Sequence, residues 1–82
     1  MDMKKTYQYN VIFRAEPEGG YTVMVPALPG CVTYSKTLIA AKRMALDAIE
    51  AYCTSLKKHN ESIPSDEGTF VASLNLERAQ TS

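Results

Sequence analysis

The residue types that could do chemistry in this chain are one histidine, two cysteines and a few paired acids. A hydrolase uses such groups as positioned acids, bases or nucleophiles. His59 lies in the polar run of residues 57–60, which is typical of a solvated helix end. Cys31 has no basic neighbour in the sequence, so a buried thiol is favoured over an exposed nucleophile, and Cys53 falls beside an apolar helical stripe. We therefore expect no catalytic residue.

The acidic residues occur in pairs, but no pair is placed as metal chemistry requires. Two-metal catalysis needs carboxylates that project from strands or helix ends into one cluster. The pairs instead fall in predicted turns or on a polar helical face: Glu16 and Glu18, Asp47 and Glu50, Asp66 and Glu67. No CxxC pair occurs, and a zinc site needs about four ligands. The sequence predicts no metal site and no cofactor, and a metal-dependent nuclease would have to use these acids.

Charge and hydropathy argue against further classes of function. Nine basic and nine acidic residues give a formal net charge of zero, whereas a protein that holds nucleic acid by its phosphates usually has a basic excess. A membrane span needs about 18 consecutive apolar residues, and no such run occurs. Residues 1–5 lead directly into alternating tyrosine and polar residues, without the apolar core of a leader. We therefore expect a cytoplasmic protein without a membrane segment.

The elements that would position these residues are predicted from hydrophobic periodicity. Residues 7–14 alternate between apolar and polar, which marks a half-buried strand. Residues 21–25 predict a second strand, joined to the first by the turn at residues 16–20. Residues 31–34 predict a short third strand, and the alternation over residues 70–76 predicts a fourth.

The period changes after Thr37, where apolar residues recur every three or four positions as far as Leu56. This spacing predicts an amphipathic helix of about five turns, with Thr37 as N-cap and Asn60 as the C′ residue. The resulting order is β-β-β-α-β, an α+β fold with a single mixed sheet and one helix packed on one face. The fourth strand is expected beside the first, in sheet order 3-2-1-4. We predict a single domain over residues 1–82, with its core at about residues 6–76.

This arrangement leaves one face of the sheet uncovered. Ile12, Met24 and Val71 are expected on that face, where they would form the interface of a homo-oligomer, a dimer or larger. The alternative is that these apolar residues are scattered singly and contact nothing.

The connection between the second and third strands is a rigid apolar corner. Pro26 and Pro29 fix the backbone, and Gly30 supplies the freedom to restart the strand. Because rigid surfaces lose little entropy on binding, the corner is a candidate partner-binding surface. The candidate residues are Pro26, Ala27, Leu28, Pro29 and Gly30. The apolar Ile39 is a further contact or, alternatively, an incidental apolar residue on the surface. The alternative for Leu28, together with Cys31, is that it packs beneath the start of the helix.

The corner, the helix and the segment after it resemble the HicB antitoxin family. That family typically shows Y-x-V-x-V-P-x-L-P-G-C, then a helix start T-L-x-x-A, then an exit H-G-E-x-I-P. The matching residues are 21–31, Thr37 and Leu38, Ala48 and Ile49 with Leu56, and residues 59–64. Asn60 departs from the family glycine, and Ile39 and Ala40 stand where acids are usual.

The resemblance implies a partial ribonuclease-H-like fold that lacks the catalytic acids. It also implies an antitoxin that binds and neutralises a HicA-type, RNA-cleaving toxin by direct protein contact. Family members often carry a C-terminal DNA-binding domain. Because this chain ends at Ser82, we expect a short form without direct DNA binding. The alternative functions are a standalone oligomeric domain of this fold with another partner, and the metal-dependent nuclease considered above.

Overall fold

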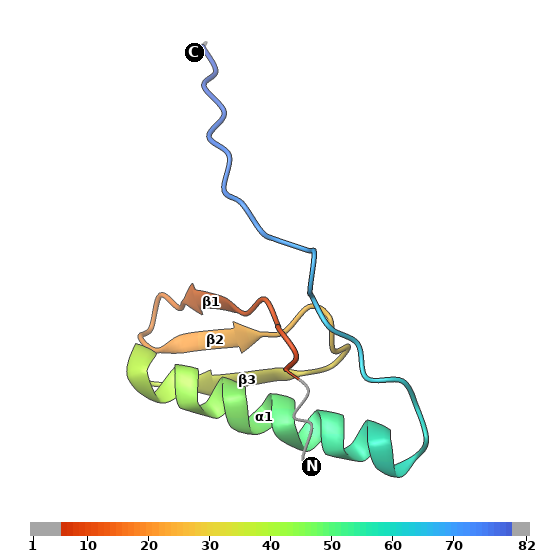
Figure 1. Cartoon of the computed structure of the whole chain (residues 1–82). Coiled ribbons are helices and arrows are strands. Elements are labelled where there is room, and N and C mark those ends of the chain that lie inside the picture. Colours follow the sequence, from red (N-terminus) through yellow and green to blue (C-terminus); the bar gives the residue numbers. More distant parts are fainter. Residues whose placement is uncertain (1–5, 80–82) are drawn as a thin grey trace.

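A three-stranded antiparallel sheet lies on a single helix, and a C-terminal tail extends away from both (Figure 1). This architecture comes from a computed structural model, which describes residues 6–79. Residues 1–5, on which the expectation about a leader rests, lie outside that range, as do residues 80–82 at the end of the predicted domain.

The sheet consists of β1 (Ile12–Ala15), β2 (Tyr21–Met24) and β3 (Val32–Ser35), in that spatial order. Both pairings are antiparallel, and Phe13 lies opposite Val23 while Met24 lies opposite Val32. The α+β class and the meander of the first three strands are therefore confirmed. Because side chains alternate between the two faces, Phe13 and Val23 face the helix and Ile12 and Met24 face outward.

The helix α1 (Leu38–Lys58) packs against β2 and β3 through a stripe of small and apolar residues. Ala41 and Ala45 are buried against Val23, because a methyl side chain lets the helix approach the sheet closely. A second cluster joins Val25, Leu28 and Cys31 to Ala48, Ile49 and Tyr52 of the helix. The core thus lies between α1 and the inner face of the sheet, on the β2–β3 side.

Both predicted helix ends are confirmed. The Thr37 hydroxyl accepts a hydrogen bond from the Ala40 N–H at 3.1 Å, as expected of an N-cap. Asn60 has φ of +58°, the left-handed conformation that ends many helices. Lys57 and Lys58 lie in the last turn, where positive charge is favourable. Within residues 6–79, no helix is both long enough and apolar enough to cross a membrane.

The predicted fourth strand is wrong. Residues 64–69 lie beside residues 8–10, but residues 70–79 lead away from the body and pair with no strand of the described chain (Figure 1). The radius of gyration is 16.5 Å, whereas a compact chain of this length has about 12 Å. The Asp66–Thr69 turn, with Gly68 at φ of +88°, precedes this departure. The partial ribonuclease-H-like arrangement, which needs the fourth strand, is not confirmed.

Candidate functional site

The corner between β2 and β3 is built from two consecutive hydrogen-bonded turns. The Leu28 N–H donates to the Val25 carbonyl at 3.0 Å, and the Cys31 N–H donates to the Leu28 carbonyl at 2.9 Å. The second turn has Pro29 followed by Gly30 at φ of +82°, which is the pattern of a type II turn. The Val25 N–H also donates to the Cys31 carbonyl at 3.1 Å, which closes the loop. The predicted rigidity of the corner thus has a concrete hydrogen-bonded basis.

Leu28 holds the corner from beneath. Its side chain is fully buried with Val25 and Cys31, so Leu28 is a core residue; it packs with Ala48, Ile49 and Tyr52 in the middle of α1, and not beneath the start of the helix as the alternative expected. Tyr52 of α1 adds a second tie, because its hydroxyl donates to the Pro29 carbonyl at 2.9 Å. The exposed part of the corner is therefore Pro26, Pro29 and Gly30, supported by buried Leu28.

A shallow apolar hollow of about 260 Å³ lies where the corner meets the outer face of the sheet. We call it the corner hollow; its lining residues are Ile12, Met24, Val25, Pro26, Leu28, Pro29, Gly30, Cys31 and Val32. It joins two predicted sets, because the partner-binding corner and the oligomer residues Ile12 and Met24 share one surface. Val32 was missed by the sequence reasoning although it is 60% exposed; its apolar type on the outward side of β3 was the available signal.

Two predicted contact residues lie elsewhere. Ile39 is 84% exposed in the first turn of α1, which follows β3. Because Met24 and Val32 lie at the corner while Tyr21 and Ser35 lie at the other end of their strands, Ile39 and the corner are at opposite ends of the sheet. Val71 belongs to the C-terminal tail and not to the sheet.

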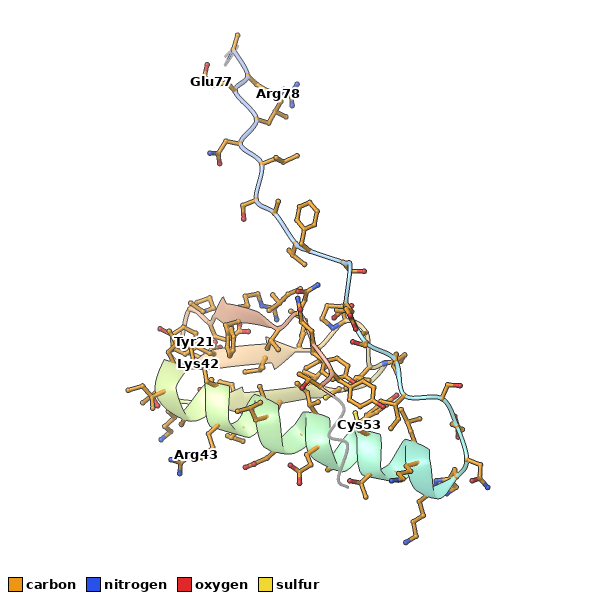
Figure 2. The ribbon with its side chains drawn as sticks, viewed as in Figure 1. Tyr21, Lys42, Arg43, Cys53, Glu77 and Arg78 are labelled. Atoms are coloured by element: carbon orange, nitrogen blue, oxygen red, sulfur yellow. The ribbon has the colours of Figure 1, made fainter. Side chains whose placement is uncertain are left out.

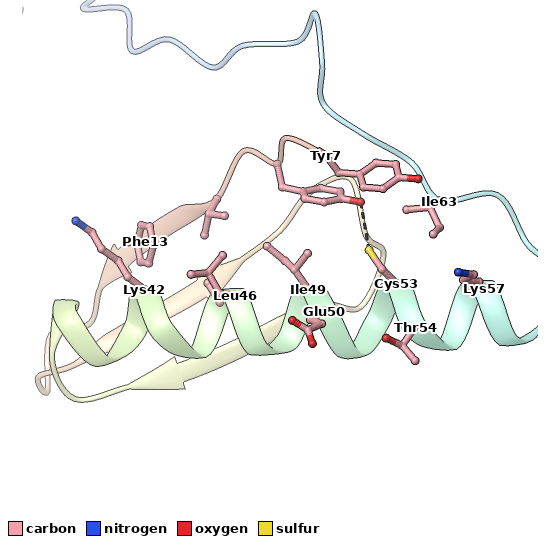
Figure 3. Close-up of a pocket in the computed structure, with 13 residues that line it drawn as sticks. Tyr7, Phe13, Lys42, Leu46, Ile49, Glu50, Cys53, Thr54, Lys57 and Ile63 are labelled. Carbon is pink, nitrogen blue, oxygen red and sulfur yellow. Dashed lines mark hydrogen bonds between the residues drawn. The ribbon is translucent and has the colours of Figure 1, made fainter. Parts of the chain in front are cut away.

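A larger groove of about 750 Å³ runs between residues 7–13 and α1 (Figure 3). It exists because α1 packs against β2 and β3 and leaves the inner side of β1 partly uncovered. We call it the helix groove; it is lined by Tyr7, Tyr9, Val11, Phe13, Lys42, Ala45, Leu46, Ile49, Glu50, Cys53, Thr54, Lys57 and Ile63. Its floor is apolar, and Leu46 on the helix is 69% exposed there. No sequence pattern distinguished this groove from ordinary core.

Tyr9 is one of the residues that line the helix groove. Its hydroxyl donates to the Pro64 carbonyl and lies 3.2 Å from the Cys53 sulfur. Burial, together with the Cys53 contact, raises the pKa of the Tyr9 phenol above its usual range. Burial, with a smaller contribution from Cys53, likewise raises the pKa of the Cys31 thiol. Both groups therefore stay protonated at neutral pH, and neither is an activated base or nucleophile.

Two of the paired acidic residues, Glu16 and Asp66, have structural partners. Glu16 accepts hydrogen bonds from the Thr22 hydroxyl and from Arg14, which together hold its pKa below the usual range. Asp66 accepts a hydrogen bond from the Asn10 N–H at 2.8 Å and so ties the C-terminal segment to residues 8–10. This tie was not predicted, since the sequence indicates only that Asp66 lies in a polar turn.

Other charged and polar groups are dispersed over the molecule. His59 is exposed, and its Nδ1 lies 2.8 Å from the Ser55 carbonyl. Glu77 and Arg78 stand at the far end of the tail, away from Lys42 on α1 (Figure 2). Across residues 6–79, no three or more His, Cys, Asp or Glu residues are grouped to hold a metal ion. What this arrangement offers is apolar contact surface: the corner hollow on one face and the helix groove on the other.

Comparison with known proteins gives a consistent set of matches. A family profile described as the HicB-like antitoxin of bacterial toxin–antitoxin systems matches residues 9–79. A UPF0150 protein of Thermoplasma acidophilum is 52% identical over 59 residues, which cover 72% of this chain and 86% of that protein. A UPF0150 protein of Synechocystis is 33% identical over 64 residues, covering 78% and 81%. One from Archaeoglobus fulgidus is 35% identical over 64 residues, covering 78% and 84%.

Proposed function

The chain belongs to the HicB-like antitoxin family, and we propose that it binds and neutralises a HicA-type, RNA-cleaving toxin by direct protein contact. The family match over residues 9–79 is the observation that carries the proposal. It includes the corner, the whole of α1 and residues 64–69, the segment that is tied to residues 8–10.

We place the toxin contact at the corner hollow. Its backbone is fixed by two prolines and by turn hydrogen bonds, so binding would order few additional groups. Pro26 and Pro29 are exposed beside Val32, which gives an apolar centre for an interface. Because Ile39 lies at the other end of the sheet, it is a separate contact, reached only by a partner that spans the length of β3.

In this proposal the protein acts by occupying the toxin's surface and not by chemistry. The protonated Cys31 thiol and Tyr9 phenol supply neither base nor nucleophile. With a formal net charge of zero, the chain also has no overall attraction for the phosphates of DNA or RNA. Neutralisation would therefore follow from blocking the toxin's access to RNA.

The proposal is tested by co-expression with a HicA-type toxin encoded beside the gene for this chain. We expect growth rescue and recovery of a stable complex by affinity purification. Val32→Lys and Pro29→Glu should each weaken the complex, because they place charge in the corner hollow. Ala51→Glu is the matched control. Ala51 is exposed on α1 and lines neither the corner hollow nor the helix groove, so the change should leave the complex intact.

Two results would contradict the proposal. Absence of both rescue and complex with the wild-type chain would remove the toxin-neutralising function and favour a standalone domain with another partner. Complex formation that survives both corner variants would keep the function but move the contact away from the corner hollow.

A further inference from the structure

The C-terminal tail has the pattern of a strand without a partner. Its even-numbered residues Phe70, Ala72, Leu74 and Leu76 are apolar, and most of the residues between them are polar. Phe70, Leu74 and Leu76 are all more than 80% exposed. Among the described residues, none from Phe70 onward has a hydrogen bond to the body. An amphipathic strand of this kind is stable only when its apolar face is covered.

The sheet of the described residues has an unpaired edge at β1 that could accept such a strand. Within residues 6–79 the sheet order makes β1 an edge strand, so one side of its backbone has no strand partner in that part of the chain. Directly beneath this edge runs the helix groove, with Phe13 on the strand side and Leu46 and Ile49 on the helix side (Figure 3). A strand added to the edge would carry alternate side chains into this groove.

We propose that residues 70–76 of one copy pair with the free edge of β1 in a second copy, and that the exchange is reciprocal. In the resulting dimer Phe70, Ala72, Leu74 and Leu76 of each copy fill the helix groove of the other. The intervening residues Val71, Ser73 and Asn75 face outward. Such an exchange is a two-fold symmetric interface, in which each copy gives one strand and receives one.

The path of the chain favours a second copy over the chain's own β1. The segment before the tail is tied to residues 8–10 by the Asp66 N–H to the Gln8 carbonyl at 2.7 Å and by the Asn10 side chain to the Thr69 carbonyl at 3.2 Å. Beyond this point the chain projects away from its own sheet (Figure 1). Ten residues from position 70 to 79 span up to about 33 Å, whereas a four-residue β1 needs about 13 Å of strand. The tail is therefore long enough to reach and cover the edge of a neighbouring molecule.

The exchange leaves the corner hollow open. The helix groove lies on the side of the sheet that α1 covers. Ile12, Met24 and Val32 of the corner hollow lie on the opposite side. The inference therefore goes beyond the proposed function and does not depend on it. A chain that fails to bind a toxin could still exchange its tail, and the reverse also holds.

The test measures the mass of the full chain in solution and uses two complementary charges. We expect wild type to be a dimer by light scattering. Leu46→Glu in the groove and Leu74→Lys in the tail should each raise the dimer dissociation constant about tenfold or more. Both positions are exposed in the single copy, so neither change should disturb its fold. Ser73→Lys, on the outward side of the tail, is the matched control and should leave the dimer intact.

Mixing the two single variants distinguishes exchange between copies from folding back within one copy. In a mixed dimer one tail–groove contact is wild type and the other pairs Lys with Glu, so an equimolar mixture should regain the dimer mass. A wild-type chain that stays monomeric at its highest soluble concentration overturns the inference. So does a dimer that is unaffected by both leucine variants, or a mixture that stays monomeric.

Discussion

The corner and the tail both carry apolar side chains, yet the leucine of the corner is buried and the leucines of the tail are exposed. In the corner, Leu28 is fully buried and each turn is closed by a backbone hydrogen bond. In the tail, Leu74 is 92% exposed, and the backbone of the described residues 70–79 has no hydrogen bond to the rest of its own copy. The comparison separates two kinds of apolar residue: those that complete a core within the chain, and those whose cover has to come from outside it.

Leu28 and Leu74 should give the largest difference between the two regions. Leu28→Ala removes a fully buried side chain and should lower the free energy of unfolding by about 3 kcal/mol. This loss should be independent of protein concentration. Leu74→Ala should have a smaller effect that grows with concentration, because the residue is buried only in an exchanged dimer. Urea unfolding at two protein concentrations measures both, and equal losses would erase the distinction.

Asp66 belongs to residues 64–69, the segment that is bonded to residues 8–10 just before the tail begins. Asp66→Ala removes the acceptor of the Asn10 N–H and should lower the free energy of unfolding by about 1–2 kcal/mol. Asp66→Asn keeps an oxygen acceptor in a side chain of the same shape and should recover part of the loss. Hydrogen exchange at Asn10 reports the bond directly, and unchanged protection in Asp66→Ala would show that the bond does not form in solution.

Two of the four glycines, Gly30 and Gly68, should differ for the same reason as the two leucines. Gly30 and Gly68 have similar positive φ values and room for a methyl group, so alanine adds backbone strain but no clash at either site. Gly30→Ala should cost about 1 kcal/mol, because the hydrogen bonds and the buried Leu28 hold the corner in place. Gly68→Ala should cost less, since the chain beyond it can relax. Thermal unfolding of the two variants checks the order, and a greater loss at Gly68 would reverse it.

Alkaline pH should have the smallest effect on the free energy of unfolding. That effect should come from Cys31 and Tyr9, which lie in the folded body and not in the tail. Burial raises the folded-state pKa of both Cys31 and Tyr9, so the stability that they add is complete below their unfolded pKa values. It is lost as the pH rises through the folded values, so stability should fall from about pH 9 upward. Tyr9→Phe should remove the part of the fall above about pH 10 and leave the Cys31 part. A flat profile up to pH 11 would contradict both shifts.

The predictable parts of the fold were those with local chemical signals. Thr37 and Asn60 set the helix ends because capping depends on residues close in sequence. The two prolines and Gly30 defined the corner for the same reason. Alternation predicts a strand in the tail and the crossover rule places it beside the first strand, but neither says whether that edge belongs to the same copy of the chain.

The candidate site was predictable in part. The corner residues were found, but the hollow also needs Ile12, Met24 and Val32, which meet only through strand register. The helix groove was not predicted, since it depends on α1 packing against β2 and β3 and away from β1. The tie from Asp66 to Asn10 joins residues far apart in sequence, and a pattern read along the chain does not reveal it.

The tie between residues 64–69 and residues 8–10 has a mechanical consequence. If two copies held each other by their tails, any pull on a tail would reach its own body first at Thr69 and Asp66. The backbone bond from Asp66 to Gln8 and the side-chain bonds beside it would bear the load together. The force would be borne by these hydrogen bonds, so it would not be transmitted to α1 or to its packing against the sheet.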